Sequence, residues 1–354
     1  MDFALHAWPQ GTSVTRPAIR MHQLRKPYLL YLGDAQHPTD AKTAYGLRDW
    51  SRENVLGEWS LPTATVSVGV PRLSPSAAAA AGAGSLVIGI ASVGGKLPNA
   101  WLPDLEDAIS CGLDVVSGMH TRLTSFPSLV QAAKARGVQL HDVRHSDRVF
   151  PAGTGRKRTG MRVATVGTDC ALGKKYTALA LTNALKARGA NATFRATGQT
   201  GIMIAGEGIA IDAVVADFLS GAAEMLSPDN APDHWDVIEG QGSLFHPAYA
   251  GVTLGLLHGS QPDAFVLCHD PSRKTIEYYP DFPLPELSDA IAQYVVAGRV
   301  TNRAIRCVGV SINSTTLSDA EWSEYAERVS RDLAVPVCDP MRGGVDAIAQ
   351  ALLA

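Results

Sequence analysis

The sequence lacks the features that mark membrane, disulfide-rich or nucleic-acid-binding proteins. It has no run of about 18 uninterrupted apolar residues, so no transmembrane helix is predicted. Its 5 cysteines include no CxxC pair, and their odd number argues against a disulfide framework, so we expect reduced thiols. The 31 basic residues and 34 acidic residues give a net charge of −3. The protein therefore has no overall positive electrostatic field that would attract nucleic acid or an anionic membrane.

Signals for export and for two common kinds of hydrolytic site are also missing. The first residues, MDFALHAWPQGTSVTRP, have no basic segment leading into an apolar core, so we expect a cytoplasmic protein. No His, Cys and Asp residues have the spacing of a zinc site, and no GxSxG motif occurs. The sequence therefore predicts no metal ligands and no serine hydrolase.

The length and composition predict two globular domains. The chain has 354 residues, of which 46% are hydrophobic and 18% are charged, and both values are ordinary for a globular protein. Residues 151–160, PAGTGRKRTG, contain three glycines and no apolar residue larger than alanine. We therefore expect domains at 1–152 and 161–354, joined by a linker at 153–160. The three adjacent cations of this segment are interpreted as solvated, although contact with a phosphate is an alternative.

The first domain alternates between predicted strands and predicted helices. Its apolar run at 28–32 ends at Gly33-Asp34, and a second run at 85–91 ends at the turn Ser92 to Lys96. Further strands are expected at 113–117 and 138–143, and helices at 102–111 and 126–136. This alternation predicts a Rossmann-like parallel sheet. Because ligands bind beyond the carboxyl ends of parallel strands, Asp34 is a candidate substrate-binding residue in a pocket between the domains.

The second domain begins with the most informative segment of the chain. A predicted strand at 161–166 leads into GTDCALGKK, and a helical segment from 178 to 188 follows. In a phosphate loop, backbone N–H groups and the positive end of a helix point at an anion, while a lysine adds a full charge. The candidate cofactor-binding residues are Gly167, Thr168, Asp169, Cys170, Ala171, Leu172, Gly173, Lys174 and Lys175. Five further strands, near 191–197, 235–239, 263–268, 306–312 and 335–338, predict a P-loop NTPase-like α/β domain.

This loop departs from the standard motif at two points. Five residues rather than four separate Gly167 from Gly173, and the loop then resembles the GTD-x-x-x-GK loop of dethiobiotin synthetase-like proteins. Lys175 stands where a Ser or Thr is expected, which removes the hydroxyl that normally holds Mg²⁺. Thr177 is a possible substitute, and a second cation that neutralises phosphate without a metal is the alternative.

Polar side chains at other predicted strand ends are candidates for substrate binding and catalysis. Glu239 in WDVIEGQGS and His269 in FVLCHDPSR are candidate general bases. Arg273 is a candidate for binding a substrate carboxylate through two parallel hydrogen bonds. Gln199 is a plausible substrate contact, and Asn313 is a candidate for reading a nucleotide base. Each also has a structural interpretation, in which Glu239 caps backbone and Asn313 stabilises a turn.

Four long segments occur in order along the chain: GTDCALGKKYTALAL, RATGQTGIMIAGEGIAIDAVVADFLSGAAE, WDVIEGQGSLFHPAYAGVTLGLLHG, and CHDPSR followed by YPDFPLPEL. Together they resemble the DgcN family of D-glutamate N-acetyltransferases. The resemblance covers both predicted domains and is strongest from 161 to 290. It implies an N-terminal Rossmann-like domain, a C-terminal P-loop domain, and transfer of an acetyl group from acetyl-CoA to the amine of D-glutamate.

Two other functions stay open on the residues alone. The first is an ATP-dependent ligase or kinase, which would use ATP and Mg²⁺ at the loop and act on an amino acid or small carboxylate. The second is a nucleotide-binding regulatory module without chemistry. Polar strand ends in both domains favour an enzyme over a module, and the resemblance implies that its substrate is a small amino acid. We expect a homo-oligomer. We expect neither a nucleic-acid partner nor a membrane partner.

Overall fold

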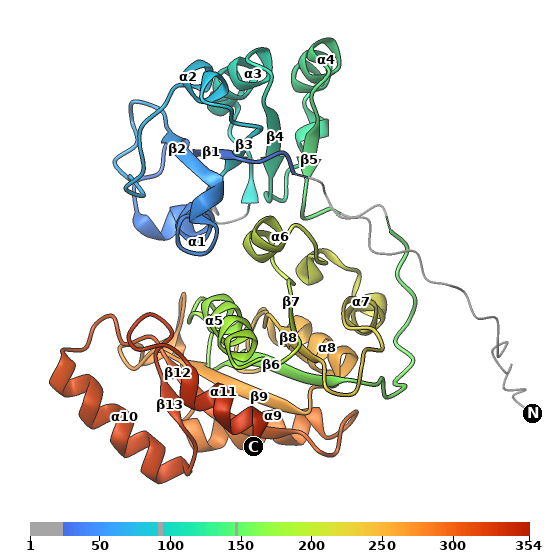
Figure 1. Cartoon of the computed structure of the whole chain (residues 1–354), viewed down its shortest axis with the longest axis vertical. Coiled ribbons are helices and arrows are strands. Elements are labelled where there is room, and N and C mark those ends of the chain that lie inside the picture. The colour runs from blue at the N-terminus through green and yellow to red at the C-terminus, as the bar shows by residue number, and fades with distance from the viewer. Residues whose placement is uncertain (1–23, 91–94, 146–147) are drawn as a thin grey trace, which may run out of the picture.

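The chain forms two α/β domains, which lie one above the other in Figure 1. The computed structural model describes residues 24–90, 95–145 and 148–354. The N-terminal sheet is parallel and has the order β2-β1-β3-β4-β5. Its strands are β1 (Tyr28–Tyr31), β2 (Val55–Trp59), β3 (Ser85–Ile88), β4 (Asp114–Ser117) and β5 (Leu140–Asp142). The predicted parallel, Rossmann-like sheet is confirmed.

The helices of this domain are α1 (Lys42–Trp50), α2 (Pro75–Ala80), α3 (Leu102–Ser110) and α4 (Pro127–Arg136), with short 3-10 helices such as η1 (Pro38–Ala41). The sequence pattern did not predict α1 or strand β2. The segment of α1 is polar overall and contains Gly46, while β2 contains Gly57 and Glu58, so neither has a conspicuous apolar run. Gly57 is needed because a Cβ there would lie 2.4 Å from the carbonyl oxygen of Pro71.

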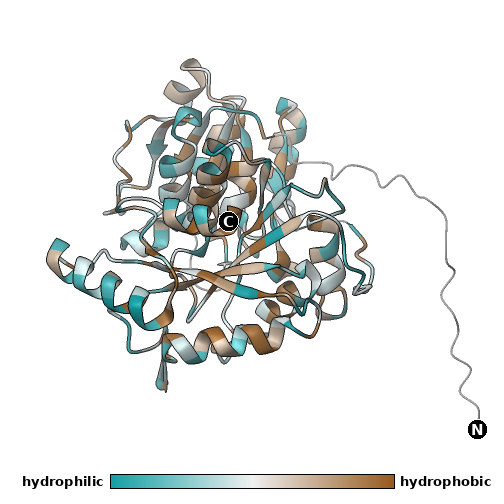
Figure 2. Cartoon of the chain, turned by 60° about the horizontal axis from the view of Figure 1, so that its bottom comes forward, coloured by the Kyte–Doolittle hydropathy of each residue, from teal (hydrophilic) through white to brown (hydrophobic). Residues whose placement is uncertain are grey.

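The C-terminal domain has a six-stranded parallel sheet of order β13-β12-β9-β6-β8-β7. Its strands are β6 (Met161–Gly167), β7 (Ala192–Arg195), β8 (Trp235–Ile238), β9 (Ala264–His269), β12 (Arg306–Ile312) and β13 (Val337–Cys338), and a separate hairpin pairs β10 (Thr275–Ile276) with β11 (Tyr279–Pro283). The helices are α5 (Lys174–Ala187), α6 (Gln199–Ala205), α7 (Leu219–Leu226), α8 (Ala250–Ser260), α9 (Leu287–Gly298), α10 (Asp319–Leu333) and α11 (Asp346–Leu353). In Figure 2 these helices carry both hydrophilic and hydrophobic residues, as expected for helices with one face against a sheet.

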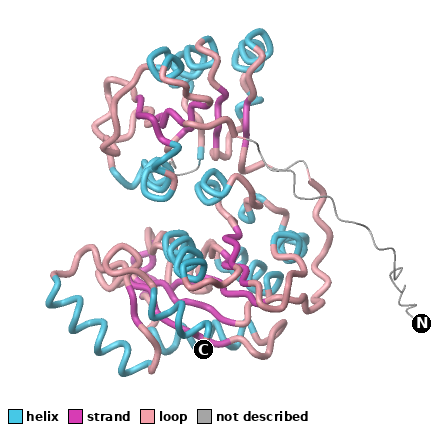
Figure 3. Tube along the Cα trace, in the orientation of Figure 1, coloured by secondary structure: helices cyan, strands magenta, loops and turns pink. Residues whose placement is uncertain are grey.

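The position of β6 in this sheet places the candidate residues together. The strand lies between β8 and β9 and pairs in parallel with both. The carboxyl ends of the three strands therefore bring the phosphate loop, Glu239 and His269 to one edge of the sheet. This edge faces the N-terminal domain, as the tube in Figure 3 shows.

The predicted linker at 153–160 packs along the C-terminal domain. The backbone N–H of Thr154 donates to the carboxylate of Glu224 at 2.8 Å. Arg158 is only 4% exposed and donates to backbone carbonyls at 2.7 Å. Phe150, which precedes the segment, belongs to a buried cluster of this domain. The expectation of solvated cations is therefore wrong for Arg158, because backbone carbonyls replace water around its guanidinium.

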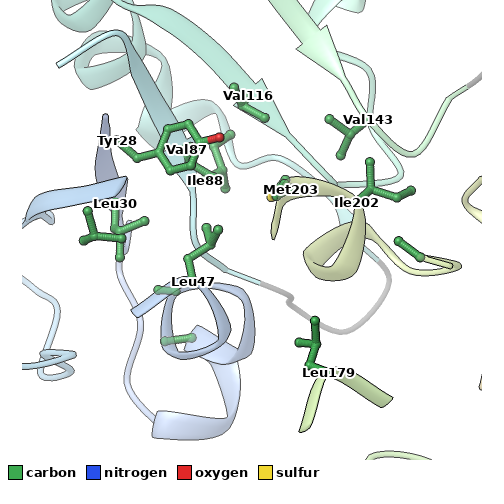
Figure 4. Packing of buried hydrophobic residues seen from close by; sticks show 14 of the residues in the cluster. Tyr28, Leu30, Leu47, Val87, Ile88, Val116, Val143, Leu179, Ile202 and Met203 are labelled. Carbon is green, nitrogen blue, oxygen red and sulfur yellow. The ribbon is translucent and has the colours of Figure 1, made fainter. Parts of the chain in front are cut away.

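Hydrophobic packing continues from one domain to the other. Leu179 of α5 and the neighbouring Ile202 and Met203 of α6 belong to the same buried cluster as Leu47 and Val143 of the N-terminal domain. Figure 4 shows Ile202 and Met203 directed toward the strands of the upper domain. Separating the domains would expose this apolar surface to water, so burial holds them against each other.

The structure also bears on the thiols and on membrane association. All five cysteines are described, and none forms a disulfide. Burial raises the pKa of Cys268 and of Cys307 to about 11, which keeps both as neutral thiols. Among the described residues, no helix is both long and apolar enough to cross a bilayer.

Candidate functional site

A cavity of about 1290 Å³ lies between the two domains. One wall comes from segments that follow strands of the N-terminal sheet, and it includes Lys42, Thr43, His120 and Arg144. The opposite wall comes from the phosphate loop and from the carboxyl ends of neighbouring strands of the C-terminal sheet. The predicted interdomain pocket is thus present. Most of the turn from Ser92 to Lys96, which was predicted to face it, lies outside the described residues.

The phosphate loop turns through two residues with positive φ before α5 begins. Ala171 has φ +53° and Gly173, the N-cap of α5, has φ +97°, a conformation that glycine adopts without strain. The segment from Cys170 to Lys175 lines the cavity, whereas Gly167, Thr168 and Asp169 lie behind it. The Nζ of Lys174 donates to the backbone carbonyl of Asp169 at 2.7 Å, and burial lowers the pKa of this lysine.

Asp169 and Arg273 hold this loop in shape. The carboxylate of Asp169 is fully buried and accepts hydrogen bonds from Cys170 N at 2.6 Å and from Glu277 N at 2.9 Å. It also accepts from Nη1 of Arg273 at 2.8 Å, and the same nitrogen donates to the carbonyl of Cys170 at 3.0 Å. Arg273 also lines the cavity, and because its Nη1 is engaged by Asp169 and Cys170, the side chain positions the loop. Its contact with a substrate carboxylate stays a prediction.

His269 lies beside the loop but does not line the cavity. Its Nδ1 is 2.9 Å from the hydroxyl of Thr168, and the ring is 9% exposed. Burial lowers the pKa of His269 to about 4, so the imidazole is neutral at physiological pH. A neutral imidazole can accept a proton, but this one is not among the residues that line the cavity, which argues against its predicted role as the base.

Glu239 lines the cavity and has one carboxylate oxygen available. Its Oε2 accepts hydrogen bonds from the backbone N–H groups of Thr197 at 2.9 Å and Gly198 at 3.0 Å. Within the described parts of the chain, no residue donates a hydrogen bond to Oε1. Burial raises the pKa of Glu239, and the nearby charge of Lys175 opposes that shift in part. This combination suits a carboxylate that accepts a proton during a reaction.

Lys175 reaches from the loop toward the domain interface. Its Nζ would lie 2.6 Å from a Cβ built at Gly46 of α1, so the glycine makes room for the ammonium. Burial lowers the pKa of Lys175 to about 8, although the carboxylates of Glu239 and Asp49 favour its charged form. A cation is thus held beside the loop by electrostatic attraction to acids from both domains.

Three other predicted residues have different surroundings. Gln199 lines the cavity from the first turn of α6. Asn313 also lines it, and its Nδ2 donates to Asp270 at 3.0 Å. Asp34 is exposed and does not line the cavity, because its carboxylate accepts a hydrogen bond from Trp101 Nε1 at 3.1 Å. The geometry therefore gives no support to Asp34 as a substrate-binding residue.

The sequence analysis missed the contacts that the N-terminal domain makes at the site. The hydroxyls of Thr43 and Thr200 lie 2.9 Å apart, and Tyr176 donates to Asp49 at 2.7 Å. Arg144 pairs with Asp212 across the same interface. The available signal was the polar segment that follows the first predicted strand, whose residues lie beyond a strand carboxyl end. Nothing in that segment, however, indicates which partners it meets.

One group of described side chains has donor atoms within 4.8 Å of one another, as a metal site requires: Asp169, Cys170 and His246. The group does not suit a metal ion. The carboxylate of Asp169 is already held by Arg273 and two backbone N–H groups. His246 accepts a hydrogen bond from Ala248 N at its Nδ1, which leaves the proton of the neutral ring on Nε2.

The approach of Gly118 to Gln199 provides a test of the interdomain geometry. A Cβ at Gly118 would lie 1.8 Å from Oε1 of Gln199, so Gly118→Ala must displace the glutamine or the domain. Since a misplacement of about 1 Å can cost up to about a hundredfold in rate, we expect a clear fall in the turnover of any substrate held between the domains. Steady-state kinetics and calorimetry with a ligand of the phosphate loop would show lower turnover at similar affinity. Turnover equal to that of the wild type would contradict this geometry.

Family models match both domains of the chain. Residues 150–349 match the DUF1611 C-terminal model, described as a P-loop domain of unknown function. Residues 57–146 match the DUF1611 N-terminal model, described as a Rossmann-like domain of unknown function. The two matches agree with the two sheets seen in the structure.

Relatives that cover nearly the whole chain carry a functional name. A protein from Pseudoalteromonas sp., named D-glutamate N-acetyltransferase, is 47% identical over 326 residues, which is 92% of this chain and 98% of that protein. A protein from Tritonibacter scottomollicae with the same name is 45% identical over 331 residues, covering 94% and 99%. The crystal structure of a DUF1611 family protein from Anabaena variabilis is similar with a TM-score of 0.83 and 32% identity, covering 92% of this chain and 99% of that one.

Proposed function

The chain belongs to the DUF1611 family, and from this membership we propose that it is an N-acetyltransferase that moves an acetyl group from acetyl-CoA to the amine of D-glutamate. The main support is the near-complete overlap with two relatives that carry this activity in their names. The structure adds a cavity in which a phosphate loop and an available carboxylate face the same space. That combination suits a donor with a diphosphate and an acceptor with an ammonium group.

We assign the phosphate loop to the donor. The diphosphate of CoA would be held by backbone N–H groups of residues 170–174, by the start of α5 and by Lys174. The loop shows Lys174 folded onto the carbonyl of Asp169, from which it can turn to an anion. Arg273 and Asp169 keep the loop in shape through their mutual contact. Asn313 stays a candidate contact for the base of the donor, because it lines the same cavity.

We assign the interdomain side of the cavity to the acceptor. Gln199 and Lys42 line it from opposite domains, and both present groups that bind carboxylates. A dicarboxylic amino acid needs two such contacts, one for each carboxylate. The amine would then lie toward Glu239, a buried cavity-lining carboxylate with an oxygen to spare.

Glu239 is the proposed general base of the reaction. The amino group of D-glutamate is an ammonium ion at neutral pH and must lose a proton before it can attack a thioester. Oε1 of Glu239 accepts that proton, and the amine nitrogen then bonds to the acetyl carbonyl carbon. The carbon–sulfur bond breaks as the tetrahedral intermediate collapses, and the sulfur of CoA leaves as a thiolate. The second proton that the nitrogen loses on becoming an amide neutralises this thiolate. The backbone N–H groups of Thr197 and Gly198 hold Oε2 and so orient the carboxylate.

A release assay for free thiol tests this function against the ligase alternative. We expect acetyl-CoA with D-glutamate to release CoA thiol, detected with a disulfide dye, and L-glutamate to release much less. The matched reaction contains ATP, Mg²⁺ and an amino acid, and we expect no ADP or AMP from it. Nucleotide hydrolysis without thiol release would identify a ligase or kinase instead. The cytoplasmic location and the homo-oligomeric state stay predictions from the sequence.

A further inference from the structure

The P-loop family implies a divalent metal beside the loop, and the residues of this chain do not suit one. Standard loops hold Mg²⁺ through the hydroxyl that follows the loop lysine and an acid from a nearby strand. Mg²⁺ requires oxygen ligands in near-octahedral geometry. At the hydroxyl position this chain has Lys175, whose ammonium can neither coordinate a cation nor tolerate one nearby.

Thr177 does not replace the missing hydroxyl. Its Oγ1 donates to the carbonyl of Gly173 at 3.2 Å and lies 2.7 Å from the hydroxyl of Ser311 on β12. The side chain is only 1% exposed, and Cys268 contacts the same oxygen at 3.5 Å. The hydroxyl is therefore engaged by the sheet beneath the helix.

Glu239 stands where standard P-loop domains have the acid that supports Mg²⁺, but here it interacts with the ammonium of Lys175. The end of β8, next to β6, is where P-loop domains carry the acid that supports the metal. Here Oε2 accepts hydrogen bonds from two backbone N–H groups, and the cation that acts on the pKa of Glu239 is Lys175. Gly46 and Asp49 of the N-terminal domain complete the surroundings of this ammonium with space and negative charge.

We propose that the ammonium of Lys175 replaces the divalent metal of the phosphate loop, so that this protein binds the diphosphate of its ligand without Mg²⁺. The inference rests on the proposed function only in taking CoA as the natural ligand. Lys175 adds one positive charge to that of Lys174, so the loop offers two positive charges to a diphosphate without a metal. A ligand that arrives with its own Mg²⁺ meets repulsion from Lys175, so the site selects metal-free diphosphate esters over Mg²⁺-bound triphosphates.

Calorimetric titration with CoA and with ADP, each in EDTA and in Mg²⁺, tests the proposal. For the wild type we expect the dissociation constant of CoA to change by less than about twofold between the two conditions, because no metal is required. Lys175→Thr restores the standard hydroxyl, and its affinity for ADP in EDTA should fall at least about tenfold and recover in Mg²⁺. Lys175→Arg keeps the charge and should stay independent of metal. Lys186→Thr, on the exposed last turn of α5, is the matched control and should bind like the wild type.

Several results would overturn the proposal. One is a wild type that binds CoA or ADP only when Mg²⁺ is present, and another is a wild type that binds neither ligand in either condition. A folded Lys175→Thr variant, checked by its thermal unfolding, that binds equally well in EDTA and Mg²⁺ would also exclude it. A failure of the proposed acetyl-transfer function can be told apart from these results. If the wild type binds ADP without metal but does not bind CoA, the proposed donor is rejected and the role of Lys175 is kept.

Discussion

Replacing Glu239 with glutamine is expected to lower kcat for acetyl transfer by about a hundredfold or more, the scale of losing a general base. The amide oxygen of glutamine can still accept the hydrogen bonds of Thr197 and Gly198, so the geometry of the site should be kept. What is lost is the oxygen that takes the proton from the ammonium group. Stopped reactions that measure free thiol give kcat, and calorimetry should show the affinity for CoA nearly unchanged.

The pH dependence of the same variant provides a second measurement. Burial raises the pKa of Glu239, and the base works only when ionised, so wild-type kcat should fall as the pH drops through that raised pKa. This acidic limb should disappear in Glu239→Gln. The sign for stability is opposite to that of a paired carboxylate: the folded state holds the proton more tightly than the unfolded one, so ionisation above the ordinary pKa of glutamate costs stability. The glutamine variant should therefore unfold at the same or a higher temperature than the wild type at neutral pH.

His269→Asn is the comparison that decides between the two candidate bases. Because His269 contacts Thr168 behind the loop and does not line the cavity, its loss should lower kcat far less than the loss of Glu239. A large fall of kcat in His269→Asn, with Glu239→Gln still active, would reverse the assignment.

Replacing Lys174 with alanine is expected to weaken binding of CoA by a few kcal/mol, on the order of a hundredfold, because a buried charge partner of the diphosphate is lost. The backbone N–H groups of the loop stay in place, so the variant should keep its fold and some affinity. Isothermal calorimetry measures the difference directly. Burial lowers the pKa of Lys174, and affinity should fall as the pH rises through that value, since a neutral amine cannot pair with phosphate.

Two further variants separate this effect from general changes in charge. Lys174→Arg keeps the charge but is too large for the space beside Gly167 and Gly240, where Cβ atoms would lie 3.1 and 3.0 Å from the lysine side chain. It should rescue affinity only in part. Lys186→Ala removes an exposed charge from the end of the same helix and should leave binding unchanged. Unaltered CoA affinity in Lys174→Ala would exclude the loop as the donor site.

Local sequence was sufficient to predict the phosphate loop and most of both sheets. A buried strand has a continuous apolar run, and glycines mark turns, so residues 161–188 alone predict strand, loop and helix. Helix α1 and strand β2 were missed because each contains glycine and charged residues that hide the apolar period. Their burial depends on neighbours distant in the sequence, such as the backbone of Pro71 against Gly57.

The sequence by itself determined the class of the two domains, the loop with its two lysines and the presence of Glu239 and His269 at strand ends. Only the tertiary structure decided which of these side chains reach the cavity. His269 turns to Thr168 and Asp34 to Trp101, and neither lines the cavity. Arg273 does line it, although its Nη1 is held by Asp169. The physical reason is that the end of a strand fixes the position of a residue's backbone. The direction of the side chain depends on the hydrogen bonds and the burial that segments far away in the chain provide.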